Sequence, residues 1–290
     1  MGVPYAEVIG DPIAHSKSPT IHKFWLERLG IEGDYRSCRV EEDRLHRYFA
    51  ERRRDTQWRG CNVTMPHKVM VVPFMGRLSQ TAEKCGAVNI VVREGDGSLR
   101  GHNADALAIS QILQGFGRSL YPNQIASYVQ IVGAGGAARA AVIGAVEAGY
   151  CDFDFFNRHI EGARALAAWL SLNPEMYGAP LEGLGPIRNP DDGPNDQRYS
   201  HVVVNATRMG MDGYPDVAID LAAYYPDTIV IDLAYGPRET GLVRQARSLG
   251  LRVADGLDVL VEQAALAFEL FFGIAAPRQH DAELRKSLTS

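Results

Sequence analysis

Lys68 and Asp105 are two side chains of this sequence whose types suit acid–base chemistry on a small molecule. A lysine that works together with an aspartate can transfer a proton to or from an alcohol or a carbonyl oxygen. Both residues follow predicted strands, where polar side chains gather. A structural explanation stays open for each, because lysine is usually solvated and aspartate is common in turns.

Hydroxyl and amide side chains occur at other predicted strand ends and loops of the first half. The polar clusters are Ser16-Lys-Ser18, Asn62-Val-Thr64 with Lys68, Asn89, and Asn103-Ala-Asp105. Strand ends in an α/β sheet converge on one crevice, and hydroxyl and amide groups suit a small polyhydroxylated ligand. Ser18-Pro19 also suits a helix cap, so spacing alone leaves open whether these clusters form one site.

The middle of the chain, from Tyr128 to Arg139, indicates a nucleotide site. Gly133, Gly135 and Ala138 match the G-x-G-x-x-A pattern between a short apolar strand and a helix. The first glycine permits a tight turn, the second lets the backbone approach a pyrophosphate, and the alanine lets the helix lie against the strand. The helix N-terminus offers free N–H groups and a partial positive charge to phosphate groups.

The next predicted strand, Cys151 to Phe156, indicates which dinucleotide binds. In an NAD site an Asp or Glu usually ends this strand and binds the ribose hydroxyls. Here the strand ends in Asn157-Arg158, whose amide and guanidinium suit the 2′-phosphate of NADP, which a carboxylate would repel. These residues favour NADP, with a solvated surface charge as the alternative for Arg158.

Alternating strands and helices are predicted to position these residues. In the first half, the predicted strands are Tyr5–Gly10, Tyr35–Val40, Gly60–Thr64, Gly86–Arg93 and Leu99–Asn103, the last two joined by a D-G hairpin turn. The predicted helices there cover Thr20–Gly30 and Glu41–Arg54, and a further helix begins at Met65–Lys68.

The second half predicts the βα units of a doubly wound parallel sheet. The predicted strands are Tyr128–Val132, Asp152–Phe156, His201–Asn205, Thr228–Leu233 and Leu251–Ala254, and the predicted helices are Ala138–Ala148, Gly162–Leu172, Gly241–Leu249 and Leu257–Phe272. Residues 173–198 are rich in Pro, Gly and Asp and predict a long irregular connection. The predicted fold class is α/β.

Composition narrows the range of functions. The 290 residues are 46% hydrophobic and 22% charged, which is normal for a soluble globular protein. The net charge of −5 lacks the excess of basic residues that is typical of nucleic-acid-binding proteins, so nucleic acid is not expected as a partner. No apolar run reaches membrane-spanning length. Cys38, Cys61, Cys85 and Cys151 are widely spaced, which predicts reduced thiols in a cytoplasmic protein. The eight histidines lack metal-ligand spacing, so no metal is expected.

The motifs of this chain closely resemble those of the shikimate dehydrogenase family, from near residue 5 to near residue 275. The matching segments are Gly10–Pro19, Asn62–Lys68, Gly86–Asn89, Gly133–Ala137, Asn157-Arg158, Val204–Thr207 and Asp255–Leu257 leading to Gln263–Ala265. Several of these segments are highly specific, and they follow the order of the family.

The resemblance implies an NADP-dependent oxidoreductase that reversibly reduces 3-dehydroshikimate to shikimate in chorismate and aromatic amino-acid biosynthesis. It implies that residues 1–106, completed by C-terminal helices at 256–290, form a substrate-binding and catalytic domain. Residues 107–255 are then a Rossmann-like NADP-binding domain, with the active site in the cleft between the two domains. A homodimer is a possible assembly that the sequence leaves open.

The resemblance also implies roles for individual residues. Lys68 and Asp105 would be the catalytic pair. The implied substrate-binding residues are Ser16, Ser18, Thr64, Lys68, Asn89, Asp105, Tyr235 and Gln263. The implied cofactor-binding residues are Gly133, Ala134, Gly135, Gly136 and Ala137 at the pyrophosphate, Asn157 and Arg158 at the adenosine phosphate, and Leu233 and Gly256 at the nicotinamide end.

The chain departs from the family pattern at several positions. Where the family usually reads G-D-N-T-D-G, this chain reads Gly101-His-Asn-Ala-Asp-Ala106. Gly162 stands where many NADP-using members have a second basic residue, and Arg164 is the nearby candidate to compensate. Arg208 occupies a place that is more often small or apolar.

These departures keep two alternatives open. One is a relative that acts on quinate or an amino-substituted analogue, with NAD or relaxed cofactor use. The other is a non-catalytic NADP-binding regulator, against which the presence of both Lys68 and Asp105 argues.

Overall fold

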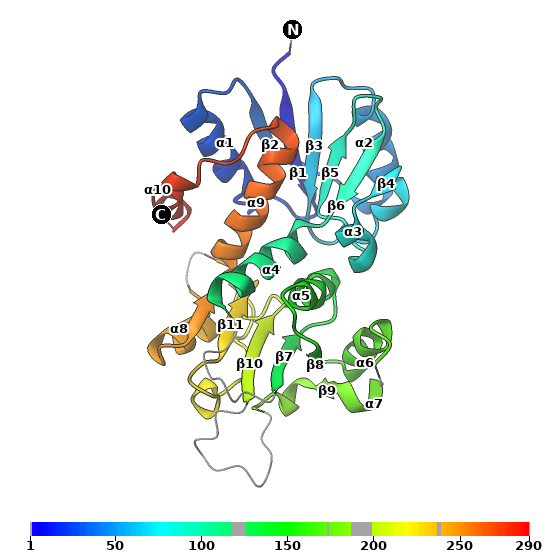
Figure 1. Cartoon of the computed structure of the whole chain (residues 1–290). Helices are drawn as coiled ribbons and strands as arrows, with labels where there is room; N and C mark the ends of the chain where they lie inside the picture. The colour runs from blue at the N-terminus through cyan, green and yellow to red at the C-terminus, as the bar shows by residue number, and fades with distance from the viewer. Residues whose placement is uncertain (1, 118–125, 173, 187–198, 237–238, 290) are drawn as a thin grey trace. The chain divides into compact units, whose positions relative to one another are not determined.

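The computed structural model describes residues 2–117, 126–172, 174–186, 199–236 and 239–289. The chain forms two compact units, each built around a six-stranded sheet (Figure 1). The first unit consists of Met1–Leu107 together with Leu260–Ser290, and the second of Ala108–Val259. The boundaries fall within two helices, α4 (Ala104–Phe116) and α9 (Gly256–Phe272).

The first unit contains a mixed sheet with the strand order β2-β1-β3-β5-β6-β4. Its strands are β1 (Tyr5–Gly10), β2 (Asp34–Arg39), β3 (Trp58–Val63), β4 (Arg77–Leu78), β5 (Ile90–Arg93) and β6 (Leu99–His102). β1 is parallel to β2 and β3, while β5 is antiparallel to β3 and β6. The ends of β1, β3 and β6 therefore lie at the same edge as the start of β5, where the predicted polar clusters occur.

Helices pack on both faces of this sheet. The helices of the first unit are α1 (Ser18–Leu29), α2 (Leu45–Arg52), α3 (Gln80–Cys85), the start of α4, most of α9, and α10 (Asp281–Thr289), with 3-10 helices at Glu42–Arg44, Val72–Phe74 and Arg278–His280. Trp25 of α1 contacts Phe268 of α9, with ring centroids 5.5 Å apart. Phe49 of α2 and Ala82 of α3 belong to a separate cluster of buried residues with Val91.

The second unit contains a fully parallel sheet with the strand order β12-β11-β10-β7-β8-β9. Its strands are β7 (Ala126–Val132), β8 (Asp152–Asn157), β9 (Gly178–Pro180), β10 (Tyr199–Asn205), β11 (Ile229–Asp232) and β12 (Arg252–Ala254). The predicted doubly wound sheet is confirmed. The strand order reverses between β7 and β10, and sheets of this kind bind ligands at that point.

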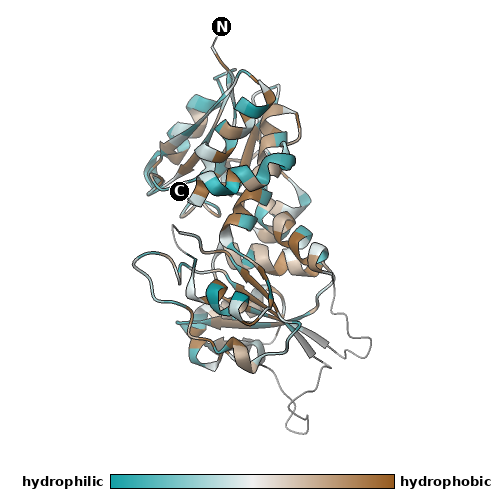
Figure 2. Cartoon of the chain, turned by 90° about the vertical axis from the view of Figure 1, so that its left-hand side faces the viewer, coloured by the Kyte–Doolittle hydropathy of each residue, from teal (hydrophilic) through white to brown (hydrophobic). Residues whose placement is uncertain are grey.

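Successive side chains of β10 point to opposite faces of this sheet, and because these side chains are apolar, helices cover both faces. Val202 and Val204 pack in one cluster with α5 (Gly136–Glu147) and α6 (Ile160–Trp169), whereas Val203 packs in another with α8 (Gly241–Ser248). The remaining helices are α7 (Pro174–Tyr177) and 3-10 helices at Leu181–Gly183 and Leu221–Ala223. In Figure 2 the strands of this sheet are mostly hydrophobic, and the surrounding helices carry both kinds of residue.

The prediction that a helix begins at Met65–Lys68 is wrong. This segment consists of turns that lead to the 3-10 helix Val72–Phe74. Pro66 and Pro73 lack a backbone N–H, and each disfavours helical conformation in the residue before it. Lys68 is therefore carried by a turn. The predicted helix Glu41–Arg54 likewise begins as a 3-10 turn and becomes α-helical only at Leu45.

Two further predictions need correction. The predicted strand Gly86–Arg93 is shorter, because Gly86 adopts a left-handed conformation (φ 57°) that ends α3, and β5 begins only at Ile90. The predicted irregular connection at 173–198 contains α7 and the edge strand β9. The sequence did not indicate this strand, because it contains glycine and proline, which are rare in strands other than at the edges of a sheet. Residues 187–198 lie outside the described residues.

None of the helices in the described ranges is long and apolar enough to cross a lipid bilayer. None of the four cysteines, all of which lie in the described ranges, forms a disulfide bond.

Candidate active site

Lys68 and Asp105 form a hydrogen-bonded ion pair in the first unit. Lys68 Nζ lies 2.5 Å from Asp105 Oδ2, and the two side chains are 19% and 14% exposed. Lys68 lies in the turn after β3, whereas Asp105 lies in the first turn of α4, where the helix dipole favours a carboxylate. The fold therefore brings together the two residues predicted to act as a pair, and it leaves them partly open to a ligand.

Hydrogen bonds from the segment before β5 hold both partners. The carbonyl oxygen of Lys68 accepts a hydrogen bond from the backbone N–H of Val88 at 2.7 Å. The side-chain oxygen of Asn89 accepts one from the backbone N–H of Ala104 at 2.8 Å. Asn89 is only 2% exposed. This buried asparagine therefore fixes the start of α4, from which Asp105 extends.

Asn103, the residue just before α4, also fixes the start of this helix. Its Oδ1 accepts a hydrogen bond from the backbone N–H of Ala106 at 3.2 Å, and its Nδ2 donates to the carbonyl of Ala87 at 3.0 Å. An asparagine that caps a helix satisfies one of the unpaired N–H groups of the first turn. Asn103 is thus a helix cap, and it connects α4 to the loop that carries Asn89.

Tyr35 connects the segment Ser16–Ser18 to the end of β3 through hydrogen bonds. Its hydroxyl donates to Asn62 Oδ1 at 2.6 Å and is hydrogen-bonded to Ser18. Burial raises the pKa of Tyr35, so the phenol stays protonated. The hydroxyl of Ser16 accepts a hydrogen bond from the backbone N–H of Ser18 at 3.3 Å. Ser16 and Ser18 are thereby positioned next to the strand that leads to Thr64.

Two buried amide groups of this site have unused donors. Among the described residues, Nδ2 of Asn62 and Nδ2 of Asn89 have no hydrogen-bond partner. A buried donor without a partner costs free energy, so such groups are uncommon unless a ligand or water completes them. These amides are consistent with a site for an oxygen-rich ligand.

Gln263 reaches the first unit on α9. It is half-buried and lies one helical turn before Ala267. Ala267 packs in one apolar cluster with Tyr35 and Ala104, which belong to the segments described above. The helix therefore places Gln263 in the first unit, one turn from a residue that packs with Tyr35 and Ala104.

The turn between β7 and α5 has the geometry expected of a phosphate-binding turn. Gly133 has a φ of 114°, and a Cβ atom there would lie 3.0 Å from the carbonyl oxygen of Ala206, so only glycine fits. Gly135 is the N-cap of α5, and a Cβ atom on it would meet nothing within 4 Å. The free N–H groups of Gly136 and Ala137 thus begin a helix beside open space, which fits a pyrophosphate.

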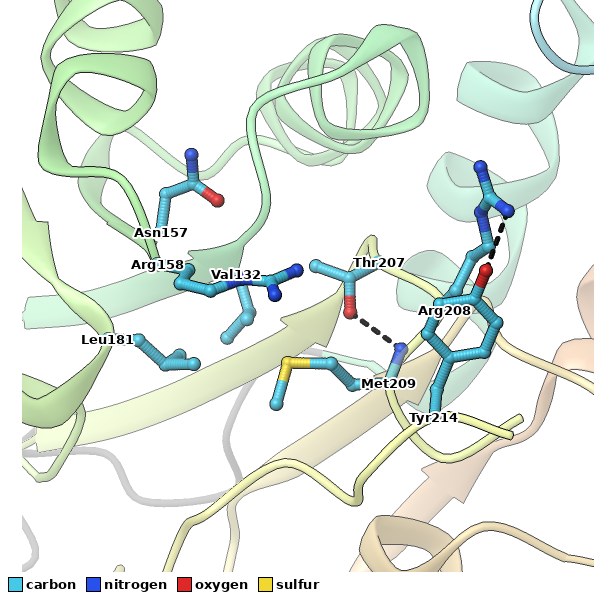
Figure 3. Close-up of a pocket in the computed structure, with 8 residues that line it drawn as sticks. All are labelled: Val132, Asn157, Arg158, Leu181, Thr207, Arg208, Met209 and Tyr214. Atoms are coloured by element: carbon cyan, nitrogen blue, oxygen red, sulfur yellow. Dashed lines mark hydrogen bonds between the residues drawn. The ribbon is translucent and has the colours of Figure 1, made fainter. Parts of the chain in front are cut away.

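A cavity of about 240 Å³ lies at the carboxyl ends of β7, β8 and β10. Its lining residues are Val132, Asn157, Arg158, Leu181, Thr207, Arg208, Met209 and Tyr214. Figure 3 shows Thr207 between Arg158, which follows β8, and Arg208, which follows β10. Two guanidinium groups beside an amide and a hydroxyl fit a phosphorylated ribose.

Asn205 and Asp232 hold the loops that follow β10 and β11. Asn205 Oδ1 accepts hydrogen bonds from the N–H and the hydroxyl of Thr207, and its Nδ2 donates to Met209 and to Asp232 Oδ1. Asp232 also accepts from the Thr240 hydroxyl at 2.5 Å. Burial raises the pKa of Asp232 to about 6, against the opposing effect of these hydrogen bonds. The network fixes the residues that line one side of the cavity.

Leu233, Tyr235 and Gly256 lie together at the end of β11 and the start of α9. A Cβ atom on Gly256 would lie 2.4 Å from the carbonyl oxygen of Ala234 and 2.9 Å from Tyr235 Cβ, so the close approach of helix and loop requires glycine. Burial raises the pKa of Tyr235. These three residues therefore lie together at the carboxyl end of β11.

Several residues of the cavity were not predicted from the sequence as site residues. Thr207 follows β10, which borders the reversal of strand order, and this position is a signal that identifies it. Leu181 begins a single-turn 3-10 helix and Tyr214 lies in an irregular segment, and no periodic pattern indicates the position of either residue. In the part of the chain that the structure describes, no group of three or more His, Cys, Asp and Glu side chains is arranged to hold a metal ion.

Two family models match the chain. The model of the shikimate dehydrogenase substrate binding domain matches residues 8–91. The model of the shikimate 5′-dehydrogenase C-terminal domain matches residues 256–283. The first match includes Lys68 and Asn89, and the second includes Gly256 and Gln263.

Relatives with these names align over nearly the whole chain. The shikimate dehydrogenase (NADP(+)) of Sphingopyxis alaskensis is 44% identical over 287 residues, which is 99% of this chain and 97% of the relative. A crystal structure of shikimate 5-dehydrogenase from Thermus thermophilus in complex with NADP(H) and shikimate is 32% identical, with a TM-score of 0.79 and coverage of 98% and 99%. Quinate dehydrogenase from Corynebacterium glutamicum in complex with NAD is 28% identical, with a TM-score of 0.78 and coverage of 98% and 99%.

Proposed function

Because this chain belongs to the shikimate dehydrogenase family, we propose that it catalyses the reversible, NADP-dependent reduction of 3-dehydroshikimate to shikimate. This reaction belongs to chorismate and aromatic amino-acid biosynthesis. The observation that carries the proposal is the shielded ion pair of Lys68 and Asp105, with 2.5 Å between Nζ and Oδ2. A proton donor held in this way suits a carbonyl that becomes an alcohol.

In the proposed reaction, Lys68 acts on the oxygen of the substrate carbonyl. When bound, NADPH supplies the hydride that the carbonyl carbon receives. The negative charge that develops on the oxygen is stabilised by the Lys68 ammonium, which also donates the proton. Asp105 orients the ammonium through the contact at Nζ and exchanges the proton afterwards. In the direction of shikimate oxidation the same two groups remove the proton of the hydroxyl.

The other polar residues of the first unit are proposed to bind the substrate. Ser16 and Ser18 hold the carboxylate, and Thr64, Asn89 and Gln263 bind hydroxyl groups. The unused amide donor of Asn89 supports this assignment. We propose that Tyr235 also hydrogen-bonds the substrate, with the phenol kept protonated by its raised pKa.

The residues of the second unit are proposed to bind NADP. The turn from Gly133 to Ala137 binds the pyrophosphate, and the open space at Gly135 supports this role. Asn157 and Arg158 line the cavity and bind the adenosine 2′-phosphate. Leu233 and Gly256 contact the nicotinamide end.

The proposed domain organisation follows from these roles. Residues 1–106 with 256–290 form the substrate-binding and catalytic domain, and residues 107–255 form the NADP-binding domain. The protein is proposed to act in the cytoplasm, where free thiols remain reduced.

A spectrophotometric assay of NADPH formation tests the proposed reaction. The purified protein is incubated with shikimate and NADP, and the absorbance of NADPH is followed. We expect saturable turnover that depends on both compounds. Folded protein that binds NADP but forms no NADPH from shikimate would instead be the non-catalytic regulator.

Quinate oxidation with NAD is the second candidate, because the quinate dehydrogenase from Corynebacterium glutamicum in complex with NAD shares the fold at 28% identity. The same assay is repeated with quinate and with NAD in all four combinations. A higher kcat/KM for quinate with NAD than for shikimate with NADP would replace the first proposal by the second.

A further inference from the structure

The adenosine 2′-phosphate of NADP needs more positive charge than Arg158 alone supplies. A phosphate monoester carries between one and two negative charges near neutral pH. Gly162, in the first turn of α6 and next to Asn157, carries no charge. The cavity beside Asn157 and Arg158 is therefore incomplete unless another element contributes a cation.

A side chain at position 162 would first meet the amide of Asn157. A Cβ atom there would lie 2.3 Å from Nδ2 of Asn157 and 3.2 Å from Cβ of Ala134. The Asn157 amide donates to the carbonyl of His159 at 3.0 Å, so it is fixed in that place. A basic residue at position 162 would require the asparagine to shift, and since this chain has glycine there, a second cation has to come from another position.

Arg164, the candidate suggested by the sequence, is already neutralised. Its Nη2 lies 2.5 Å from Oε2 of Glu175, and its Nη1 lies 3.7 Å from Oε1 of Glu161. It is also absent from the residues that line the cavity. Arg164 therefore ties α6 to α7 and does not compensate for Gly162.

Arg208 meets the requirement. It lines the cavity together with Arg158, and Thr207 lies between the two arginines (Figure 3). Its Nη1 donates to the hydroxyl of Tyr214 at 2.8 Å, and its guanidinium carbon lies 5.5 Å from the centre of the same ring. Among the described residues, no carboxylate forms an ion pair with Arg208. Its charge and most of its five N–H donors are therefore available to an anion.

We propose that Arg208 is the second cation of the 2′-phosphate site and that Tyr214 holds its guanidinium in place. The phosphate binds between Arg158 and Arg208, so the loop after β10 supplies the charge that the start of α6 lacks. This inference rests on the proposed function, because it names the residue that distinguishes NADP from NAD at the same cofactor site.

Binding of nucleotide fragments tests the inference without turnover. The fragments are adenosine 2′,5′-bisphosphate, which carries the 2′-phosphate, and 5′-AMP, which lacks it. We expect Arg208→Gln to weaken binding of the bisphosphate by about 10- to 100-fold, as for a lost charge-assisted hydrogen bond, and to change 5′-AMP binding by less than about twofold. Isothermal titration calorimetry measures both.

Three variants make the result specific to Arg208. Arg164→Gln is the matched control, and it should leave the affinity for both fragments unchanged. Arg208→Lys should recover part of the lost affinity, because it keeps the charge without the planar fork. Tyr214→Phe should cause a smaller loss, because it removes only the hydrogen bond that holds the guanidinium. If Arg208→Gln leaves bisphosphate binding unchanged, or weakens both fragments equally, the inference is wrong.

This test separates the inference from the proposed reaction. Turnover of shikimate with unchanged bisphosphate binding in Arg208→Gln would overturn the inference and keep the dehydrogenase. A selective loss of bisphosphate binding in a protein that oxidises no shikimate would support the inference and reject the dehydrogenase.

Discussion

The ammonium of Lys68 is held by the carboxylate of Asp105, and in the proposed reaction this contact determines where the proton is delivered. The two residues come from segments that are 37 positions apart in the sequence. Val88 and Asn89 bind to both segments, so the pair depends on a loop that takes no part in the proton transfer.

Replacing Lys68 with alanine should lower kcat for shikimate oxidation by about 10²- to 10⁴-fold. KM for shikimate should change far less, because the main contribution of Lys68 is to the transition state. Steady-state kinetics with shikimate and NADP measure both constants. Lys286→Ala, at an exposed lysine of α10, is the control and should keep normal kinetics. Near-normal kcat in Lys68→Ala would remove this residue from the mechanism.

Arg158 is a second single residue with a testable role, because it is predicted to bind the 2′-phosphate of NADP. Arg158→Ala should raise KM for NADP by about 10-fold or more and leave KM for NAD within about twofold. The physical reason is that only NADP carries the phosphate that the guanidinium binds. Arg47→Ala, an exposed arginine on α2, serves as the control. An equal effect on the two cofactors would show that the 2′-phosphate was wrongly assigned.

At the scale of elements, the pairing of β3 with β5 brings the polar clusters of the first unit together. Asn62 of β3 lies opposite Ile90 of β5, so Thr64 and Asn89 emerge at the same edge. Gly60 makes this pairing possible. Its φ is 153°, and a Cβ atom on it would lie 2.1 Å from the carbonyl oxygen of Val91.

Gly60→Ala should destabilise the protein by about 3 kcal/mol, through overpacking and backbone strain. Urea denaturation followed by circular dichroism measures the free energy of unfolding. Gly95→Ala is the matched control, because a Cβ atom there meets nothing within 4 Å, and it should change stability by less than about 0.5 kcal/mol. If both variants are equally stable, β3 and β5 have more room than the contact at Val91 indicates.

At the scale of the whole molecule, stability should depend on pH through a half-buried carboxyl of the second sheet. Burial raises the pKa of Asp154 to about 6, and the neighbouring Asp152 adds to this effect. Between about pH 4 and pH 6 the folded protein keeps a proton that the unfolded chain loses. The free energy of unfolding therefore falls as the pH rises through this window, and the whole loss of stability is present above pH 6.

Asp154→Asn should remove this cost. The full shift corresponds to about 3 kcal/mol, but the carboxylate is partly solvated, so we expect about 1 kcal/mol and an increase in Tm of about 2–4 °C at pH 8. Below pH 4 the variant and the parent should unfold at similar temperatures. Thermal unfolding at both pH values measures this, with Glu42→Gln as the control for loss of one exposed negative charge. Equal Tm values at pH 8 would contradict the raised pKa.

The sequence allowed most of the fold to be predicted, and the reasons are local. Apolar strands followed by glycine turns identified the parallel sheet of the second unit, since each βα unit carries its own signal. Prediction was wrong where prolines interrupted a helical pattern, as at Met65–Lys68, and where a strand was too short for a pattern, as at β9. The roles assigned to the individual site residues remain predictions.

The sequence by itself determined which side chains are present for chemistry and which turn has the glycine pattern of a phosphate-binding turn, because residue type and short-range spacing decide both. The tertiary structure alone decided which of these side chains meet. It placed Lys68 against Asp105, paired Arg164 with Glu175, and placed Arg208 at the cavity that Arg158 also lines. These contacts join residues from different elements, and strand order and helix packing set their distances, which no local pattern encodes.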